Sequence, residues 1–333
     1  MISTGKKLLI TGANGFVGSF ILREAMKRNF DAYAAVRKGS DLSRIEKLNP
    51  KYIYTDFEDE DLLRSQLDEN HFDYIIHSAG LTRAAEHANL YKVNSAYLRK
   101  ILQILIEENR IPKKFVYLSS LAAYGPADLQ PDALVSNQSY PHPLTHYGKS
   151  KLQAEQFLNN YRSIPHLIFR PTAVYGPGEK DLFISIKGIN RGINARIGKF
   201  RQLLTFVYVK DLARLLVDSL EAKAVNKSYF VSDGELYNIE SFGEIVAEIL
   251  NKKPINIHVP LKLIRLVTPL IEKLSKFSGN YPALHVDKIA ELISQSWNCD
   301  TYGIQRDFGF EAEYKLEQGM KETIGWYKDH GWL

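Results

Sequence analysis

The sequence predicts an α/β fold, namely a doubly wound parallel sheet followed by a smaller, mostly helical C-terminal lobe. Up to about residue 175, short β-branched runs alternate with longer helical segments, which is typical of a parallel sheet covered on both faces. A glycine-rich turn joins the first strand to the first helix. From residue 235 onward the pattern is mostly helical and is interrupted by several prolines.

The elements of the first part follow one another in a regular order. The expected strands are KLLITG, DAYAAVR, KYIYTD, DYIIHSAG, KFVYLSS and HLIFRPTAVYG. The expected helices cover residues 16–29, 41–48, 60–69, 88–109 and 144–161. Further along, LTFVYVKDLARLLVDSL predicts a strand and a helix, and KSYFVSDG predicts another strand. Because such sheets bind ligands beyond the carboxyl ends of their strands, the residues that follow each strand are the candidate site.

Composition excludes several classes of protein. The chain has 333 residues, of which 45% are hydrophobic and 24% charged, as in soluble globular proteins with one large or two modest domains. The net charge is only +5 and no basic block alternates with aromatic residues, so we expect no nucleic-acid partner. The single cysteine, Cys299, excludes an internal disulfide, predicts no metal site and favours a reducing, cytoplasmic setting.

No apolar run approaches the ~20 residues of a membrane span. The nearest is VPLKLIRLVTPLIEKL from Val259, which Lys262, Arg265 and Lys273 interrupt. It predicts an amphipathic helix, and we expect its apolar side to pack on a neighbouring element rather than on lipid. Some apolar residues of the lobe either line a substrate pocket or belong to the core. They are Phe183, Ile184, Ile264, Leu270 and Phe277.

The glycine turn predicts a Rossmann-type dinucleotide site. In ITGANGFVGSF, Gly12, Gly15 and Gly18 are spaced GxxGxxG between the first strand and the first helix. Glycines permit the tight turn and a close backbone approach, while the helix N-terminus offers free N–H groups to a pyrophosphate. We therefore expect a nucleotide-binding domain over residues 1–175 and about 205–233. Residues 176–204 and 234–333 are expected to form the substrate-binding lobe.

The ends of the second and third strands bear on the choice of dinucleotide. Arg37 stands where a carboxylate would bind the ribose of NAD, and its guanidinium suits a 2′-phosphate. The alternatives are that Arg37 stacks on adenine or points to solvent, or that Asp41 folds back onto the ribose. NADP(H) is therefore favoured and NAD(H) stays possible. After the third strand, Asp56 and Phe57 fall where adenine would lie, although capping of the next helix explains an acidic loop equally well.

A serine, a tyrosine and a lysine form the candidate chemistry. Ser119 and Ser120 end the fifth strand, and Tyr147 and Lys151 in THYGKSK are one helical turn apart on one face. A free phenol has a pKa near ~10, which a neighbouring ammonium and an oxidised nicotinamide would lower. Tyr147 then exchanges a proton with a substrate oxygen. The alternative is two ordinary residues on a solvated helix face.

These motifs, in this order, resemble the extended short-chain dehydrogenase/reductases, the NAD-dependent epimerase/dehydratase family, over essentially the whole chain. The matching stretches are TGANGFVG, HSAG, LSSLAAYG, YGKSK, RPTAVYGPG, FVYVKDLA and the closing FGFEAEYKLEQGMKETIGWYKDHGWL. The resemblance implies a catalytic triad of Ser120, Tyr147 and Lys151. It also implies cofactor contacts at Gly12, Asn14, Gly15, Phe16, Val17, Gly18, Arg37, Asp56, Phe57, Ala79, Gly80, Tyr147, Lys151 and Pro171.

The same resemblance places Asn94 in a helix lining the cofactor site, with an asparagine that merely points to solvent as the alternative. His77 and His146 border the site and are expected to be packing or loop residues. The apolar stripe of SAYLRKILQILIEEN is expected to be core. In family members that helix and the Tyr147 helix commonly form a two-fold interface, so we expect a homodimer.

Departures from the family pattern narrow the choice among the reactions that family members catalyse. Leu121 and Ala122 stand where related dehydratases carry an Asp-Glu pair, and Ala173 replaces the asparagine that holds a nucleotide diphosphate. With Arg37, these residues favour an NAD(P)-dependent oxidoreductase that interconverts a secondary alcohol and a ketone. The alternative is an NAD-dependent nucleotide-sugar epimerase. A non-catalytic dinucleotide-binding protein is the least expected, because such proteins typically lose the tyrosine or lysine.

Overall fold

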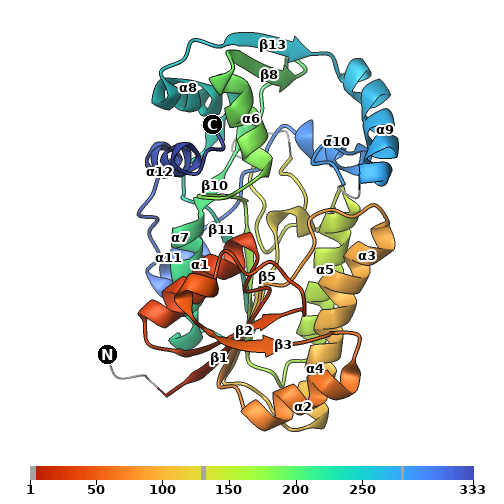
Figure 1. Ribbon diagram of the computed structural model, residues 1–333, viewed down its shortest axis with the longest axis vertical. Helices are drawn as coiled ribbons and strands as arrows, with labels where there is room; N and C mark the ends of the chain where they lie inside the picture. Colours follow the sequence, from red (N-terminus) through yellow and green to blue (C-terminus); the bar gives the residue numbers. More distant parts are fainter. Residues whose placement is uncertain (1–4, 129–132, 279–280) are drawn as a thin grey trace.

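The computed structural model describes residues 5–128, 133–278 and 281–333, with only the backbone of 275–278. Its centre is a seven-stranded parallel sheet with helices on both faces (Figure 1), as expected. From one edge to the other the strands are β11 (Lys227–Val231), β6 (His166–Pro171), β5 (Lys114–Leu118), β4 (Tyr74–His77), β1 (Lys7–Thr11), β2 (Asp31–Val36) and β3 (Lys51–Tyr54). The chain runs outward from β1 to β3 and then returns to β4. The switch point therefore lies between β1 and β4, where sheets of this kind bind ligands.

Two apolar cores hold the helices on this sheet. One face packs against α1 (Phe16–Lys27), α7 (Val209–Asp218) and α11 (Tyr302–Phe308) through a cluster that includes Leu22 and Leu216. The other face packs against α2 (Glu60–Asn70), α4 (Tyr97–Glu107) and α5 (His146–Asn160) through a cluster that includes Leu102 and Leu158. A short helix α3 (His87–Tyr91) and a π-helical turn (Lys92–Ala96) lead into α4, and 3₁₀ turns cover Glu46–Leu48, Leu121–Ala123 and Ser219–Glu221.

The C-terminal lobe has a third apolar core. It gathers α6 (Asp181–Asn190), α8 (Ile239–Leu250) and α12 (Leu316–Asp329), with residues such as Ile186, Val246 and Met320. Short strands pair as β7 (Ala173–Tyr175) with β10 (Phe206–Tyr208), β9 (Leu203–Leu204) with β12 (Tyr237–Asn238), and β8 (Ile193–Ile197) with β13 (Ile255–Val259). Helices α9 (Leu261–Ser278) and α10 (Val286–Leu292) complete the lobe (Figure 1). Phe206 packs into this core and Val207 into the sheet, so β10 contributes to both units.

Two expected elements differ from the structure. The helix expected over 41–48 is only the 3₁₀ turn, because the Asp41 carboxylate accepts from the Ser43 N–H and so ties the backbone into a non-helical turn. The strand expected for HLIFRPTAVYG is two strands, because β6 ends at Pro171 and Ala173 already pairs with β10.

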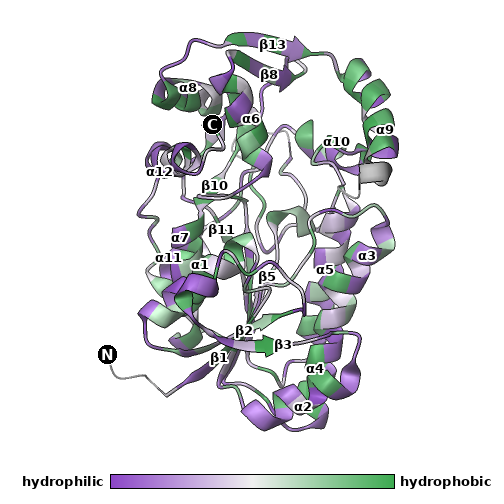
Figure 2. Cartoon of the chain, viewed as in Figure 1, coloured by the Kyte–Doolittle hydropathy of each residue, from purple (hydrophilic) through white to green (hydrophobic). Residues whose placement is uncertain are grey.

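The apolar side of α9 was expected to pack on a neighbouring element, and this expectation is wrong. Leu266 and Leu274 are 69% and 70% exposed, and Leu263 and Leu270 are also exposed. Figure 2 shows this helix as a largely hydrophobic ribbon at the margin of the lobe. No helix in the described parts of the chain has the length and apolar character needed to cross a membrane.

A buried ion pair fixes α5 to the sheet. Arg170, in β6, donates to both oxygens of the Glu155 carboxylate in α5, and both side chains are at most 3% exposed. The Ser119 hydroxyl, at the end of β5, donates to the same carboxylate. Asn137 accepts from the third nitrogen of the Arg170 guanidinium, Nη1, at 2.7 Å, and the guanidinium lies over the Tyr124 ring. The pair therefore joins α5, β5 and β6 at one point.

We expect Glu155→Gln to lower the free energy of unfolding by roughly 3–5 kcal/mol, because it leaves the arginine charge buried without its partner. Urea denaturation followed by circular dichroism measures this loss. The control is Glu317→Gln, which removes an exposed i,i+4 pair with Lys321 and should leave the midpoint nearly unchanged. Equal midpoints for Glu155→Gln and the wild type would contradict the prediction.

Candidate active site

The glycine turn forms a backbone cradle at the switch point. Gly12 has a left-handed φ of 68°, and a Cβ atom there would lie 2.7 Å from the backbone of Ala79. A Cβ on Gly18 would lie 2.1 Å from the Gly12 carbonyl oxygen. The turn after β1 therefore packs directly against the loop after β4, with no room for side chains between them.

The N-terminus of α1 suits the pyrophosphate of a dinucleotide. Gly15 is the N-cap residue and has no side chain to accept a hydrogen bond. Ser19 makes the first bond of the helix, to the Gly15 carbonyl, so the N–H groups of Phe16, Val17 and Gly18 have no partner within the helix. These donors, and the positive end of the helix dipole, fit an anionic group that approaches the cradle. The residues present therefore fit NAD(P).

The predicted contacts to the adenosine half differ in their placement. Arg37 directly follows β2, is exposed, and makes no ion pair with the residues that the structure describes, so its guanidinium is available. Arg44 instead donates to the Gly178 carbonyl oxygen at 2.8 Å. The Asn14 side-chain amide donates to the backbone oxygen of Asp41, which holds the glycine turn next to the loop after β2. The structure therefore leaves Arg37 accessible here, together with the neighbouring exposed Lys38.

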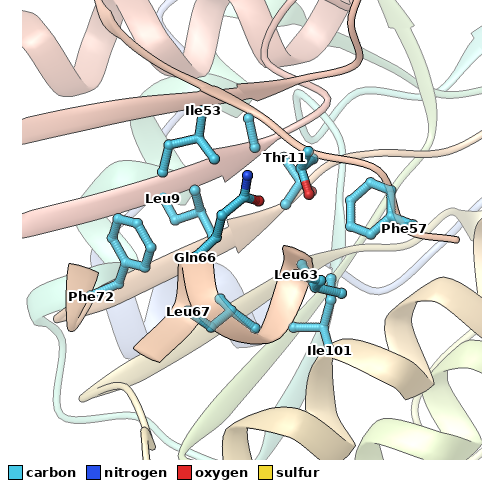
Figure 3. Close-up of a pocket in the computed structure, with 11 residues that line it drawn as sticks. Leu9, Thr11, Ile53, Phe57, Leu63, Gln66, Leu67, Phe72 and Ile101 are labelled. Atoms are coloured by element: carbon cyan, nitrogen blue, oxygen red, sulfur yellow. The ribbon is translucent and has the colours of Figure 1, made fainter. Parts of the chain in front are cut away.

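Asp56 and Phe57 follow β3, as expected, but only Asp56 is exposed. Its carboxylate accepts from the Glu58 N–H, whereas the N-cap of α2 is Asp59. The Phe57 ring is buried against Tyr97 in the second core, where it packs as an apolar side chain. Figure 3 shows this ring at the edge of a small cavity that is lined mainly by apolar residues of the core. That cavity is a packing gap and not a substrate site.

Ser120 and Tyr147 meet beyond the carboxyl end of β5. Thr145 caps α5 through a bond from the Gly148 N–H, which sets the register of the helix that carries Tyr147. Burial raises the pKa of Tyr147 to about 12, while a hydrogen bond with the Ser120 side chain opposes the rise. The sequence predicted a lowered pKa. In the protein alone, the phenol therefore stays protonated at neutral pH.

Lys151 lies one turn further along α5 and is 5% exposed. Its ammonium donates to the Leu118 carbonyl oxygen at 2.8 Å and lies 4.9 Å above the Tyr117 ring. Burial lowers the pKa of Lys151 to about 8, and the Glu155 carboxylate opposes this effect. A Cβ atom on Gly80 would lie 3.3 Å from the ammonium nitrogen, so the lysine reaches the loop after β4 that also contacts the glycine turn. The predicted catalytic and cofactor-binding residues are thus brought to one edge of the sheet.

Asn94 joins the loop after β4 to α5 next to this edge of the sheet. It is fully buried in the π-helical turn, so the solvent-facing alternative is wrong. Its amide oxygen accepts from the Leu81 N–H at 2.7 Å. Its amide nitrogen donates to the Leu81 carbonyl oxygen at 2.9 Å and to the Ser150 hydroxyl. Pro171 lies at the carboxyl end of β6, next to Arg170 of the buried pair. His77 is buried among rings and bonds Thr11, as expected of a packing residue.

The lobe supplies residues that the sequence did not reveal. Glu291 and Asp287, one turn apart on α10, accept from the Thr145 hydroxyl at 2.7 Å and from the His146 N–H at 2.8 Å. Both carboxylates stabilise the N-terminus of α5. They lie some 140 positions from that helix, so no local pattern could link them. Glu155, by contrast, is four residues after Lys151, and this spacing places it on the same helix face.

The expected apolar lining does not converge on the cleft. The Phe183 ring packs on Tyr327 and Trp332 in the core of the lobe, and Ile184 and Leu270 are more than half exposed. Ile264 lies on the inward side of α9, and the Phe277 side chain lies outside the described residues. Phe183 therefore belongs to the core, one of the two alternatives, whereas Ile184 and Leu270 do not.

Known proteins resemble this chain in both sequence and fold. The model of the NAD dependent epimerase/dehydratase family matches residues 8–239. The chain belongs to the NAD-dependent epimerase/dehydratase family. The chain is 27% identical, over 95% of its length and 94% of the relative's, to the N-acetyl-alpha-D-glucosaminyl-diphospho-ditrans,octacis-undecaprenol 4-epimerase of Escherichia coli O157:H7. It is 26% identical to the UDP-glucose 4-epimerase of Vibrio cholerae, over 96% and 94% of the two chains.

A solved structure has the same fold as this chain. The crystal structure of UDP-glucuronic acid 4-epimerase from Bacillus cereus in complex with NAD superposes with a TM-score of 0.77, over 97% of this chain and 99% of that one, at 19% identity. Membership of the family makes this epimerase/dehydratase-type chain an enzyme. The family is NAD-dependent, so the cofactor to consider for this site is an NAD-type dinucleotide.

We expect Gly18→Ala to weaken dinucleotide binding by about tenfold or more, because the methyl group would collide with the Gly12 carbonyl and widen the cradle. Fluorescence titration with NADH and with NADPH measures the dissociation constants. The control is Gly325→Ala, on α12, where a Cβ atom would meet nothing within 4 Å. Unchanged affinity in Gly18→Ala would show that the nucleotide does not use this turn.

Proposed function

We propose that the enzyme interconverts a secondary alcohol and a ketone by NAD(P)-dependent hydride transfer, with Ser120, Tyr147 and Lys151 as its catalytic residues. The observation that carries the proposal is the placement of Ser120 beside the buried Tyr147 phenol, which lies one helical turn from the buried Lys151, at the edge that carries the glycine cradle. The bound dinucleotide would accept or supply the hydride. Residues up to 175, with about 205–233, would bind it, and the lobe would bind the substrate.

Each side chain has one role in this proposal. The Tyr147 phenol donates its proton to the carbonyl oxygen during reduction and takes it back during oxidation. The Ser120 hydroxyl orients that oxygen by a hydrogen bond. The Lys151 ammonium, held by the Leu118 carbonyl, adds positive charge that favours the phenolate when oxidation requires it. In the protein alone, burial raises the pKa of Tyr147 to about 12, so the phenol stays protonated and the charge of the bound dinucleotide would have to lower this pKa.

A second candidate is a sugar 4-epimerase, which would use the same residues to oxidise a hydroxyl and then reduce the ketone from its other face. The two relatives named above, which match 95% and 96% of the chain, are both 4-epimerases, although dTDP-glucose 4,6-dehydratases match as much of it. Against it stands Ala173, which offers no amide to a nucleotide diphosphate. A panel of ketones with NADPH, and of UDP-sugars with NAD, separates the two. Net consumption of NADPH supports the first candidate, and sugar inversion without net cofactor change supports the second.

We expect Tyr147→Phe to lower turnover by about 100-fold or more while cofactor affinity stays largely unchanged, because only the proton carrier is removed. Steady-state rates and a cofactor titration measure the two effects. The control is Tyr161→Phe, which removes a phenol oxygen from the other end of the same helix. An unchanged rate in Tyr147→Phe would reject the assignment, and would favour the non-catalytic alternative if the wild type is also inactive.

We also propose that NADP(H) is preferred, since Arg37 is an exposed cation directly after β2. Arg37→Asp should shift the ratio of the NADPH and NADH dissociation constants by about tenfold or more toward NADH, because a charge-assisted bond to the 2′-phosphate is lost. Titration of both cofactors measures this ratio. The exposed Arg162→Asp serves as the control. Equal preference for the two cofactors in the wild type and in Arg37→Asp would contradict the proposal.

Assembly and location complete the proposal. We propose a two-fold homodimer through α4 and α5, whose outer side carries the exposed Ile106 and an Arg99 guanidinium stacked on Phe157. We also propose a cytoplasmic location, based on the single buried Cys299. A monomer in sedimentation equilibrium would contradict the first, and recovery from an extracytoplasmic fraction would contradict the second.

A further inference from the structure

Helix α9 presents three distinct sides. Leu261, Ile264, Thr268 and Glu272 recur every three or four residues and face the lobe, since they are its less exposed positions. Glu272 accepts from the Val286 N–H, at the start of α10. The polar contacts of α9 therefore lie on its inner side, and its outer side is free to meet another surface.

The outer side of α9 is apolar. Its exposed large hydrophobic residues are Leu263, Leu266, Val267, Leu270, Ile271 and Leu274, which fall at i, i+3, i+4, i+7, i+8 and i+11 and so form one stripe. Their exposed fractions run from 36% to 70%. Such a stripe on a long helix is unfavourable in water, and contiguous exposed apolar surface usually marks an interaction site.

A basic flank borders the apolar stripe. Lys262, Arg265 and Lys273 fall next to one another on the helical wheel, between the apolar stripe and the inner side. All three are exposed, and none pairs with an acid within the described residues. The helix has a single acidic residue, Glu272, whose carboxylate is held inward by α10. The exposed part of α9 is thus apolar on one side and purely cationic on the next.

We propose that α9 is an interfacial helix that docks the enzyme on an anionic lipid bilayer. Helices that lie in a membrane surface combine an apolar face, which inserts at the acyl boundary, with lysine and arginine that contact anionic headgroups. A second copy of the chain fits this surface poorly, because pairing two α9 helices would bring their unpaired cations together. A bilayer with negative headgroups satisfies both the apolar stripe and the flank.

The docking surface is connected to the catalytic helix. The Glu272 bond joins α9 to the first residue of α10, and Asp287, the next residue, accepts from the His146 N–H at 2.8 Å. His146 directly precedes Tyr147. Figure 1 shows α9, α10 and α5 following one another along the same side of the molecule. A bilayer bound at α9 would therefore lie on the side of the lobe that braces the active-site helix.

Vesicle co-sedimentation of the full chain tests the proposal. We expect the wild type to sediment with vesicles of phosphatidylglycerol and phosphatidylcholine, to sediment much less with pure phosphatidylcholine, and to be released by salt. Leu266→Gln/Leu270→Gln should lower the partition coefficient by about tenfold or more, because two inserted side chains are lost. Lys262→Glu/Lys273→Glu should remove the preference for anionic vesicles.

Matched controls make each outcome decisive. Val225→Gln/Leu236→Gln also removes two exposed apolar side chains, but outside α9, and should sediment like the wild type. Cofactor titration verifies that each variant is folded. Wild type that stays in the supernatant with anionic vesicles overturns the proposal, as does an equal loss in the control. A wild-type dimer that Leu266→Gln/Leu270→Gln converts to monomer, without vesicle binding by either protein, assigns the stripe to a second copy and also overturns it.

Discussion

The buried pair between Glu155 and Arg170 is the contact on which the candidate site depends. Ser120 follows the end of β5, whereas Tyr147 and Lys151 belong to α5. The Glu155 carboxylate meets Arg170 from β6 and the Ser119 hydroxyl from β5, so a single buried charge fixes all three. Burying it is tolerable only because each oxygen is bonded. Removing one partner would therefore disturb stability and active-site geometry together.

The same arrangement sets the electrostatics of the site. The Lys151 ammonium is held by the Leu118 carbonyl, and burial lowers its pKa to about 8. The pKa of Tyr147 rises to about 12 for the same reason. Burial thus disfavours the charged form of both groups in the protein alone. An oxidised dinucleotide would add positive charge next to the phenol and reverse that preference, so binding of the cofactor would itself favour a reactive phenolate.

Much of the fold and site was predictable because it depends on local pattern. The strands and helices follow the apolar periodicity, and the glycine turn, Ser120 and the Tyr147–Lys151 spacing lie where strand ends and helix faces place them. Contacts between distant residues were not predictable. Glu291 and Asp287 reach α5 from the far end of the chain, and the burial of Phe57 depends on Tyr97. The exposure of α9 also escaped prediction, since an amphipathic pattern does not tell which surface will cover it.

The central claim is that Tyr147 becomes a usable acid and base only when the dinucleotide is bound. The direct measurement is the pH dependence of kcat for alcohol oxidation, which reports the ionisations of the ternary complex. We expect the rate to rise with pH through an ionisation far below the pKa of about 12 that Tyr147 has in the free protein. We also expect this ionisation to be absent from the residual activity of Tyr147→Phe. A rate that keeps rising toward pH ~12 in the complex, or an ionisation that persists in the variant, would contradict this claim.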